Sequence, residues 1–304
     1  MFINIPNNFS SLWGELIYEY NSTDETDIVI EILDTVSDET LGVKKFYSSS
    51  SAQLNLAPIL FETALPEASQ LQFSSTISTA CGFPSVTLSD GDVSSEARTF
   101  TFADSTVSAP AALSSMPENR LLCKGERDII TFVAEDASQL SYTITASRLS
   151  DGESVTLQKS SYSVSSQAIQ HVIAADSYSA TYQALYYTLY YGSEAIASRN
   201  YTLSAEAATG YRVAWLSKHG SIEHYTFPVV EEQNYLSSGA TTRTLRSAYG
   251  TAEEVEALSE IISSPCVWRV SGDEYSELEI LTTEQQIRSL GELMIVTIKV
   301  QENG

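Results

Sequence analysis

Hydrophobic and polar residues alternate over short stretches of this chain, and polar turns separate these stretches along most of its length. Alternation with a period of two is typical of β-strands that bury one face. Asp27–Leu33, Arg127–Val133 and Leu293–Val300 are examples, and they are rich in the β-branched residues that favour strands. Because short amphipathic strands must bury one face against a second sheet, the sequence predicts a mainly β protein of serial β-sandwich domains, immunoglobulin- or fibronectin III-like.

Three domains are expected, because 304 residues are more than one hydrophobic core usually serves. Residues 1–106 are predicted to form an N-terminal β-sandwich or barrel, residues 107–206 a fibronectin III-like sandwich, and residues 207–304 a smaller C-terminal α+β module. Asp104–Pro117 is weakly patterned and contains proline, so it is predicted to be a linker. Tyr235–Gly239 is predicted to be a loop.

One helix is predicted in the last domain. Thr251 and Glu254 fit a Ser/Thr-x-x-Glu capping box, and the apolar residues that follow recur at helical spacing up to a Ser-Ser-Pro sequence. Two further segments are less regular. Pro58 has no backbone N–H to donate to a neighbouring strand, so Leu54–Phe61 is expected to be an edge strand or an irregular segment. Thr282–Leu290 is expected to be a loop or a short helix.

The densest run of large side chains, Tyr211–Pro228, predicts a β-hairpin. Trp215 lies on the apolar side of its first strand, and Gly220 permits the positive φ of a tight turn. Tyr225 and Phe227 continue the apolar pattern beyond that turn. We therefore expect a core hairpin whose tryptophan packs inside a β-domain.

Tyr182–Tyr191 predicts a strand that carries tyrosine on both faces, since Tyr187 alternates with Tyr186 and Tyr190. One interpretation is a central strand that packs on one face and turns tyrosine hydroxyls to water on the other. The second is that Tyr186 and Tyr190 form a rigid aromatic surface for a glycan or a protein partner. The sequence leaves both interpretations open.

The charge of the chain excludes several partners. Its 16 Lys+Arg and 39 Asp+Glu give a net charge of −23. Nucleic-acid affinity comes largely from cationic side chains that displace counterions, so binding to nucleic acid or to anionic membranes is not expected. Cys81, Cys123 and Cys266 are too few and too scattered for a disulfide framework, which indicates a reducing compartment. Without a leader-like N-terminus or a run of about 20 apolar residues, a soluble cytoplasmic product with no membrane insertion is expected.

Sequence motifs for catalysis or cofactor binding are not found. His219, Glu223 and His224 lie close together but lack HExxH spacing, so no metal site is expected. A G-x-S-x-G elbow, a Walker loop and a dinucleotide fingerprint are all missing from the sequence. The paired carboxylates of a glycoside hydrolase stay open as a hypothesis, because their pairing is spatial. We expect a protein without catalytic residues or cofactors.

The stretch from Trp215 to Phe227 resembles a Trp-Leu-Asn-x-x-Gly-Gly-x-Asp-x-Tyr/Phe-x-Phe motif of uncharacterised phage and prophage proteins of gut Bacteroidetes, some of which look like tail or baseplate components. Ser217 and Glu223 stand where Asn and Asp are usual. The helical run Ala257–Pro265, followed by a Val-Trp pair and closing strands, is similar to the terminal module of the same group.

This resemblance implies a non-enzymatic structural component of a phage virion, made in the host cytoplasm without a signal peptide. Its expected partners are copies of itself and other tail proteins. The alternative is a glycan- or receptor-binding surface module of the adhesin type, which would use the face of Tyr186 and Tyr190.

Overall fold

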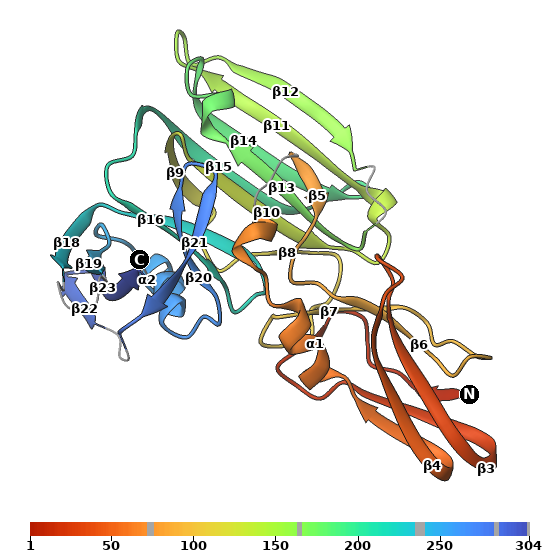
Figure 1. The fold of residues 1–304 in the computed structure, drawn as a ribbon. Helices are drawn as coiled ribbons and strands as arrows, with labels where there is room; N and C mark the ends of the chain where they lie inside the picture. The colour runs from red at the N-terminus through yellow and green to blue at the C-terminus, as the bar shows by residue number, and fades with distance from the viewer. Residues whose placement is uncertain (72–75, 163–165, 235–240, 283–285, 303–304) are drawn as a thin grey trace. The chain divides into compact units, whose positions relative to one another are not determined.

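The computed structural model describes residues 1–71, 76–162, 166–234, 241–282 and 286–302 (Figure 1). The chain forms two compact units. Unit 1 comprises Met1–Leu65 and Cys81–Ala109, and unit 2 comprises Pro66–Ala80 and Pro110–Gly304. The prediction of a mainly β protein is confirmed, since most described elements are strands arranged in several sheets. The loop predicted at Tyr235–Gly239 lies outside the described residues.

Unit 1 is built on one six-stranded sheet of order β1-β3-β6-β7-β2, in which β4 also pairs with β3. Alternate residues of β3, including Ile28, Ile30 and Ile32, are buried, so the sheet has one apolar face. β3 and β4 form a long hairpin, drawn in red and orange in Figure 1. The strands are β1 (Phe2–Asn4), β2 (Ser10–Ser11), β3 (Ile17–Asp34), β4 (Thr40–Asn55), β6 (Ser85–Ser89) and β7 (Arg98–Thr101).

A helix, α1 (Ala57–Ala64), occupies most of the segment in which Pro58 led us to expect a strand or irregular chain. That prediction for Leu54–Phe61 was wrong. Pro58 lies in the first turn of α1, where the backbone N–H groups have no intrahelical partner, so its missing N–H costs no helical hydrogen bond. Leu60 is buried, which fixes the helix in unit 1.

Unit 2 contains a β-sandwich of two sheets, with orders β5-β13-β10-β8 and β12-β11-β14-β15-β9. Phe132 and Ile169 of the first sheet and Tyr142, Tyr187 and Tyr201 of the second share one core. The strands are β5 (Ile77–Thr79), β8 (Ala111–Leu113), β9 (Asn119–Lys124), β10 (Arg127–Val133), β11 (Leu140–Arg148), β12 (Ser154–Ser161), β13 (Ala168–Ala174), β14 (Tyr182–Tyr191) and β15 (Glu194–Ala207). Three 3-10 turns also belong to unit 2: η1 (Ala68–Leu71), η2 (Ala137–Gln139) and η3 (Ala175–Ser177).

Two strands of the sandwich come from unexpected places in the chain. β5 lies inside the predicted N-terminal domain 1–106 but pairs with β13, with Thr79 opposite Ile169. β8 lies inside the predicted linker Asp104–Pro117 and pairs with β10, so the linker prediction was wrong there. Each strand is three residues long, too short for an alternation pattern to mark it in the sequence.

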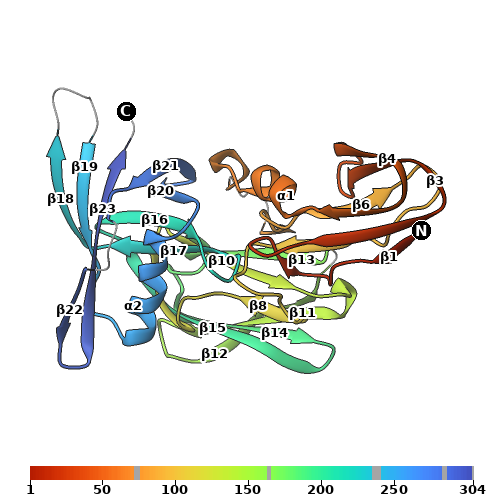
Figure 2. The same cartoon turned by 90° about the horizontal axis from the view of Figure 1, so that it is seen from below.

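The C-terminal module of unit 2 is an eight-stranded sheet of order β17-β16-β20-β21-β23-β19-β18, with β22 paired to β23. Helix α2 (Ala252–Ser259) contacts β23 (Figure 2). The strands are β16 (Tyr211–Leu216), β17 (Ile222–Phe227), β18 (Val229–Asn234), β19 (Thr241–Arg246), β20 (Val267–Ser271), β21 (Glu274–Ile280), β22 (Gln286–Leu290) and β23 (Leu293–Glu302), and η4 (Glu260–Ile262) follows α2.

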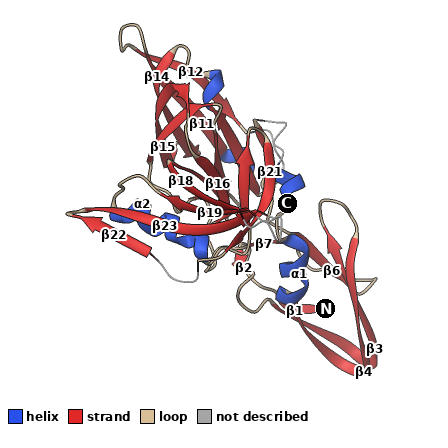
Figure 3. Ribbon diagram, turned by 60° about the vertical axis from the view of Figure 1, so that its left-hand side comes forward, coloured by secondary structure: helices blue, strands red, loops and turns tan. Residues whose placement is uncertain are grey.

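The helix prediction for this module is confirmed at its first turn, where Thr251 Oγ1 accepts a hydrogen bond of 3.3 Å from the backbone N–H of Glu254. Val255 and Leu258 of α2 are buried in the module core. The prediction for Thr282–Leu290 was wrong over its last residues, because Gln286–Leu290 pairs antiparallel with β23 (Figure 3). Pairing with β23 holds Gln286–Leu290 in a strand conformation, and the local sequence pattern did not indicate that pairing.

The hairpin expected at Tyr211–Pro228 is formed by β16 and β17, with Trp215 opposite Glu223. Gly220 has a φ of 79°, a left-handed conformation that glycine adopts without strain. Trp215 is fully buried, and Phe227 shares the core of the C-terminal module with it. Tyr225 lies at the margin of that core, partly buried. One face of the hairpin therefore supplies the apolar centre of the module.

We predict that Trp215→Ala lowers the free energy of unfolding of unit 2 by about 3–5 kcal/mol, because it leaves a cavity at a fully buried aromatic site. Tyr249→Ala is the matched control, since the Tyr249 ring is about half exposed in the same module. Urea unfolding followed by tryptophan fluorescence and circular dichroism measures both variants. An unchanged midpoint for Trp215→Ala would show that the ring does not support the core.

Candidate functional site

Buried charges meet inside unit 2, where the sandwich and the C-terminal module adjoin. Asp128, Glu126 and Glu223 are 2%, 7% and 0% exposed, although carboxylates are rarely buried unless they are paired. Arg120 and Arg212 form ion pairs with these carboxylates. We call these five residues the charged joint. The sandwich contributes Arg120 on β9, Glu126 in the turn after it and Asp128 on β10, and the C-terminal module contributes Arg212 on β16 and Glu223 on β17.

Arg120 connects the two modules directly. Its Nη1 lies 2.6 Å from Oδ1 of Asp128, and its Nη2 lies 2.8 Å from Oε2 of Glu223. Tyr201 of β15 donates a hydrogen bond of 2.7 Å to the other oxygen of Asp128. One guanidinium therefore neutralises a carboxylate of the sandwich and a carboxylate of the C-terminal module at the same time.

A second connection runs through Glu126 and Arg212. Nη1 of Arg212 lies 2.7 Å from Oε1 of Glu126, and Thr226 on β17 donates to the same oxygen. The other carboxylate oxygen of Glu126 accepts from the backbone N–H of Cys123 at 2.8 Å. Gly125 has a φ of 83°, which allows the tight turn that brings Glu126 back over β9.

The carboxylate of Glu223 also has neutral partners. Its Oε1 accepts hydrogen bonds from the backbone N–H of Ser115 at 3.2 Å and from the hydroxyl of Ser221 at 2.9 Å. Buried polar networks stabilise a unique arrangement only when each member is satisfied. Every carboxylate of the charged joint meets that condition, so the joint holds the two modules in one orientation.

The ionisation of the charged joint follows from these contacts. Burial opposes the charge on Asp128, but Arg120 and the hydrogen bond from Tyr201 outweigh it and hold the pKa of Asp128 below its usual range. Burial lowers the pKa of Arg120, while Asp128 and Glu223 raise it by more, so its pKa lies above the ordinary value. Both groups are charged at neutral pH.

His224 lies on β17 beside the charged joint. Its Nε2 is 2.8 Å from the hydroxyl of Tyr275, whereas its Nδ1 has no hydrogen-bond partner in the described part of the chain. Burial, with a further contribution from Arg212, lowers the pKa of His224 to about 3. The imidazole is therefore neutral at pH 7 and carries no positive charge into the charged joint.

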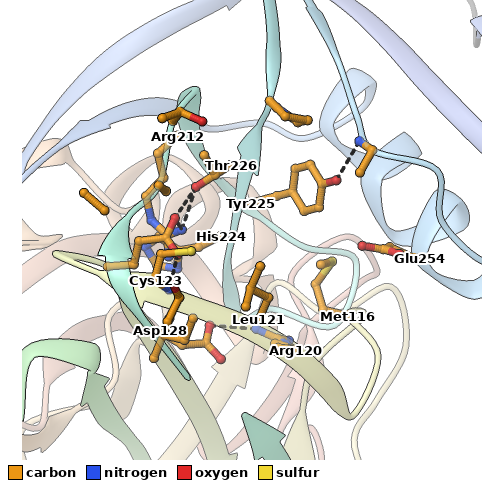
Figure 4. A pocket seen from close by; sticks show the side chains of 18 of the residues that line it. Met116, Arg120, Leu121, Cys123, Asp128, Arg212, His224, Tyr225, Thr226 and Glu254 are labelled. Carbon is orange, nitrogen blue, oxygen red and sulfur yellow. Dashed lines mark hydrogen bonds and ion pairs between the residues drawn. The ribbon is translucent and has the colours of Figure 1, made fainter. Parts of the chain in front are cut away.

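A pocket of about 410 Å³ adjoins the charged joint (Figure 4). Residues of β9, β17 and the end of β15 line it, together with Met116 and Glu254. Cys123 is one of three free cysteines of the chain and lines the pocket too, but burial raises the pKa of its thiol and keeps it protonated. The pocket therefore offers a surface for binding and no activated nucleophile among these residues.

The structure places the tyrosines of β14 as their alternation predicts, with Tyr187 buried and Tyr186 exposed to 43%. Tyr190 is half-buried on the same outer face as Tyr186. Neither belongs to the charged joint or to the pocket lining. Of the three clustered residues considered for a metal, His219 is exposed while Glu223 and His224 are buried. Among the described residues, no three His, Cys, Asp or Glu side chains are placed to hold a metal ion.

Sequence reasoning missed Arg120, Asp128 and Arg212. A weak signal was present, because Asp128 directly precedes the apolar residues of β10, and a charged residue buried at such a position needs a partner. The identity of that partner depends on tertiary contacts between residues far apart in the chain.

No family model and no curated protein matches this chain. A solved structure of Dpr2 Ig1-Ig2 in complex with DIP-Theta Ig1-Ig3 is similar over 100% of this chain and 90% of that chain, with 8% sequence identity and a TM-score of 0.23. A TM-score this low carries no inference about topology, partners or function. In the part of the chain that is described, no helix has the length and apolar character needed to cross a membrane.

We predict that Arg120→Met lowers the free energy of unfolding of unit 2 by about 3–5 kcal/mol, because it leaves Asp128 and Glu223 buried without a counter-charge. The triple variant with Asp128→Asn and Glu223→Gln removes those charges as well. It should recover a large part of the loss, as measured by urea unfolding. If the triple variant is as unstable as the single one, lost packing accounts for the effect.

Stability should also depend on pH through the buried histidines. Burial lowers the pKa of His171 to about 4 and that of His224 to about 3. Between about pH 6.5 and these values the unfolded chain binds protons that the folded chain does not, so the free energy of unfolding falls as pH falls. Each histidine contributes up to about 1.4 kcal/mol per pH unit.

Denaturation at pH 7 and pH 5 measures this slope. His224→Gln keeps a polar group that can reach Tyr275 but cannot titrate, so it should reduce the slope by up to about 1.4 kcal/mol per pH unit. His219→Gln makes the same substitution at an exposed position and is the matched control. Equal slopes in all three proteins would rule out burial of a neutral His224.

Proposed function

We propose that the protein is a non-enzymatic structural component of a phage virion, in the tail or baseplate, and that it assembles through open strand edges. One observation carries the proposal. β4 pairs only with β3 among the described residues, so the other edge of Thr40–Asn55 has no strand partner. An unpaired edge of this length is a template on which another chain can add a strand.

The side chains of β4 support this use of its edge. Val43 and Tyr47 are 48% and 74% exposed, and they point to the same face because they are four positions apart on one strand. Lys44 and Lys45 lie between them, and Arg98 is the other basic residue of unit 1. A chain with a net charge of −23 thus presents two lysines on its open edge, which favours an acidic partner such as a second copy.

Unit 2 supports a structural role in a different way. The charged joint fixes the sandwich and the C-terminal module in one orientation, and protomers in a ring or tube need such a fixed geometry to close. The resemblance to phage proteins rests on the β16–β17 hairpin and the α2 region, and both belong to unit 2. Activated nucleophiles are not found in the charged joint or its pocket, which favours assembly over catalysis.

We predict that the purified protein forms defined oligomers and that Lys44→Glu with Lys45→Glu weakens them at least tenfold. The control, Lys124→Glu with Lys159→Glu, makes the same charge change at exposed positions of the sandwich. Light scattering after size exclusion gives the masses, electron microscopy shows the assemblies, and mass spectrometry of virions tests the location. A monomeric wild-type protein that is absent from particles would contradict the proposal.

A glycan-binding surface module is the second candidate, because the outer face of the five-stranded sheet places hydroxyl side chains beside Tyr186 and Tyr190. Thr145 lies opposite Tyr186, and Ser141 lies opposite Tyr190. Aromatic rings beside hydroxyl groups suit the apolar faces and hydroxyls of sugars. A glycan array followed by titration calorimetry with Tyr186→Ala and Tyr190→Ala tests this candidate. Absence of any binder at millimolar concentration would count against it.

A further inference from the structure

Glu254 is a half-buried carboxylate at the wall of the pocket beside the charged joint. Its backbone N–H is used by the cap of α2, but its side chain makes no hydrogen bond or ion pair with any described residue. Burial raises its pKa, since no counter-charge compensates for the lost water. This contrasts with the carboxylates of the charged joint, which all have partners.

The neighbours of Glu254 at this end of the pocket are apolar and aromatic. Figure 4 shows Tyr225 and Met116 beside it. The hydroxyl of Tyr225 accepts a hydrogen bond of 3.1 Å from the backbone N–H of Ala248, which holds the ring in place. An aromatic ring, a thioether and a carboxylate without a partner are together suited to an ammonium group that carries an apolar body.

The charged side chains that line the pocket also favour a cationic ligand. Both guanidinium groups are engaged, Arg120 by Asp128 and Glu223, and Arg212 by Glu126, so neither is free to hold an anion. Glu126 and Asp128 are engaged in the same ion pairs. Glu206 and Glu254 are the lining carboxylates outside the charged joint, so the charge they add to the pocket is negative.

We propose that this pocket binds an organic ammonium ligand, with the cation at Glu254 and Tyr225 and an apolar body along Met116 and Leu121. Its volume of about 410 Å³ lies in the range of small-molecule sites. The ammonium group can belong to a free amine or to a lysine side chain of another protein. Binding at this pocket does not depend on the virion role, because the pocket lies wholly within unit 2.

Isothermal titration calorimetry with tyramine tests the proposal, since tyramine carries an ammonium group, an aromatic body and a hydroxyl. The matched ligand control is 3-(4-hydroxyphenyl)propionate, which has a carboxylate in place of the ammonium. Nα-acetyl-lysine methylamide represents a lysine side chain, and comparison of its affinity with that of tyramine distinguishes a protein partner from a free amine.

Glu254→Gln is the test variant, because glutamine also fits the third position of a capping box and leaves α2 capped. It should weaken the tighter ammonium ligand at least tenfold. Glu253→Gln, on the exposed side of the same helical turn, should leave that affinity unchanged. Binding of neither ammonium ligand at millimolar concentration, equal binding of the propionate, or equal effects of the two variants would overturn the proposal. None of these results bears on oligomer formation.

Discussion

The arrangement of unit 2 depends on the two ion pairs made by the guanidinium of Arg120. It lies between Asp128 of the sandwich and Glu223 of the C-terminal module and is 8% exposed. Burying these charges is unfavourable unless each is paired, and removing one partner leaves another charge stranded in a medium of low dielectric. The relative position of the two modules is therefore held by electrostatics in addition to apolar packing.

The ion pair between Arg120 and Glu223 also fixes the position of the β16–β17 hairpin of the C-terminal module. Glu223 stands opposite Trp215 in the register of β16 and β17, so the strand that meets Arg120 also borders the apolar core of the module. The charged joint also holds one wall of the pocket in place. A fixed pocket beside a neutral histidine suits recognition, and a fixed pair of modules suits assembly.

The sequence predicts local features well and tertiary ones poorly. Alternation located β10 and β14, and the capping box at Thr251 located α2, because these signals lie within a few residues. Pro58 misled because proline suits both a strand edge and a first helical turn. The charged joint could not be predicted, since its residues lie far apart in the chain and meet only when β9 and β17 are both in place.

The central claim is that the charged joint makes the sandwich and the C-terminal module unfold as one cooperative unit. Native-state hydrogen exchange tests this claim most directly. Amides of β11 and of β23 report on the two cores. The account predicts that both sets exchange with the same opening free energy in the wild-type protein and with different opening free energies in Arg120→Met. If the two cores already open independently in the wild type, or open together in both proteins, the charged joint does not couple them.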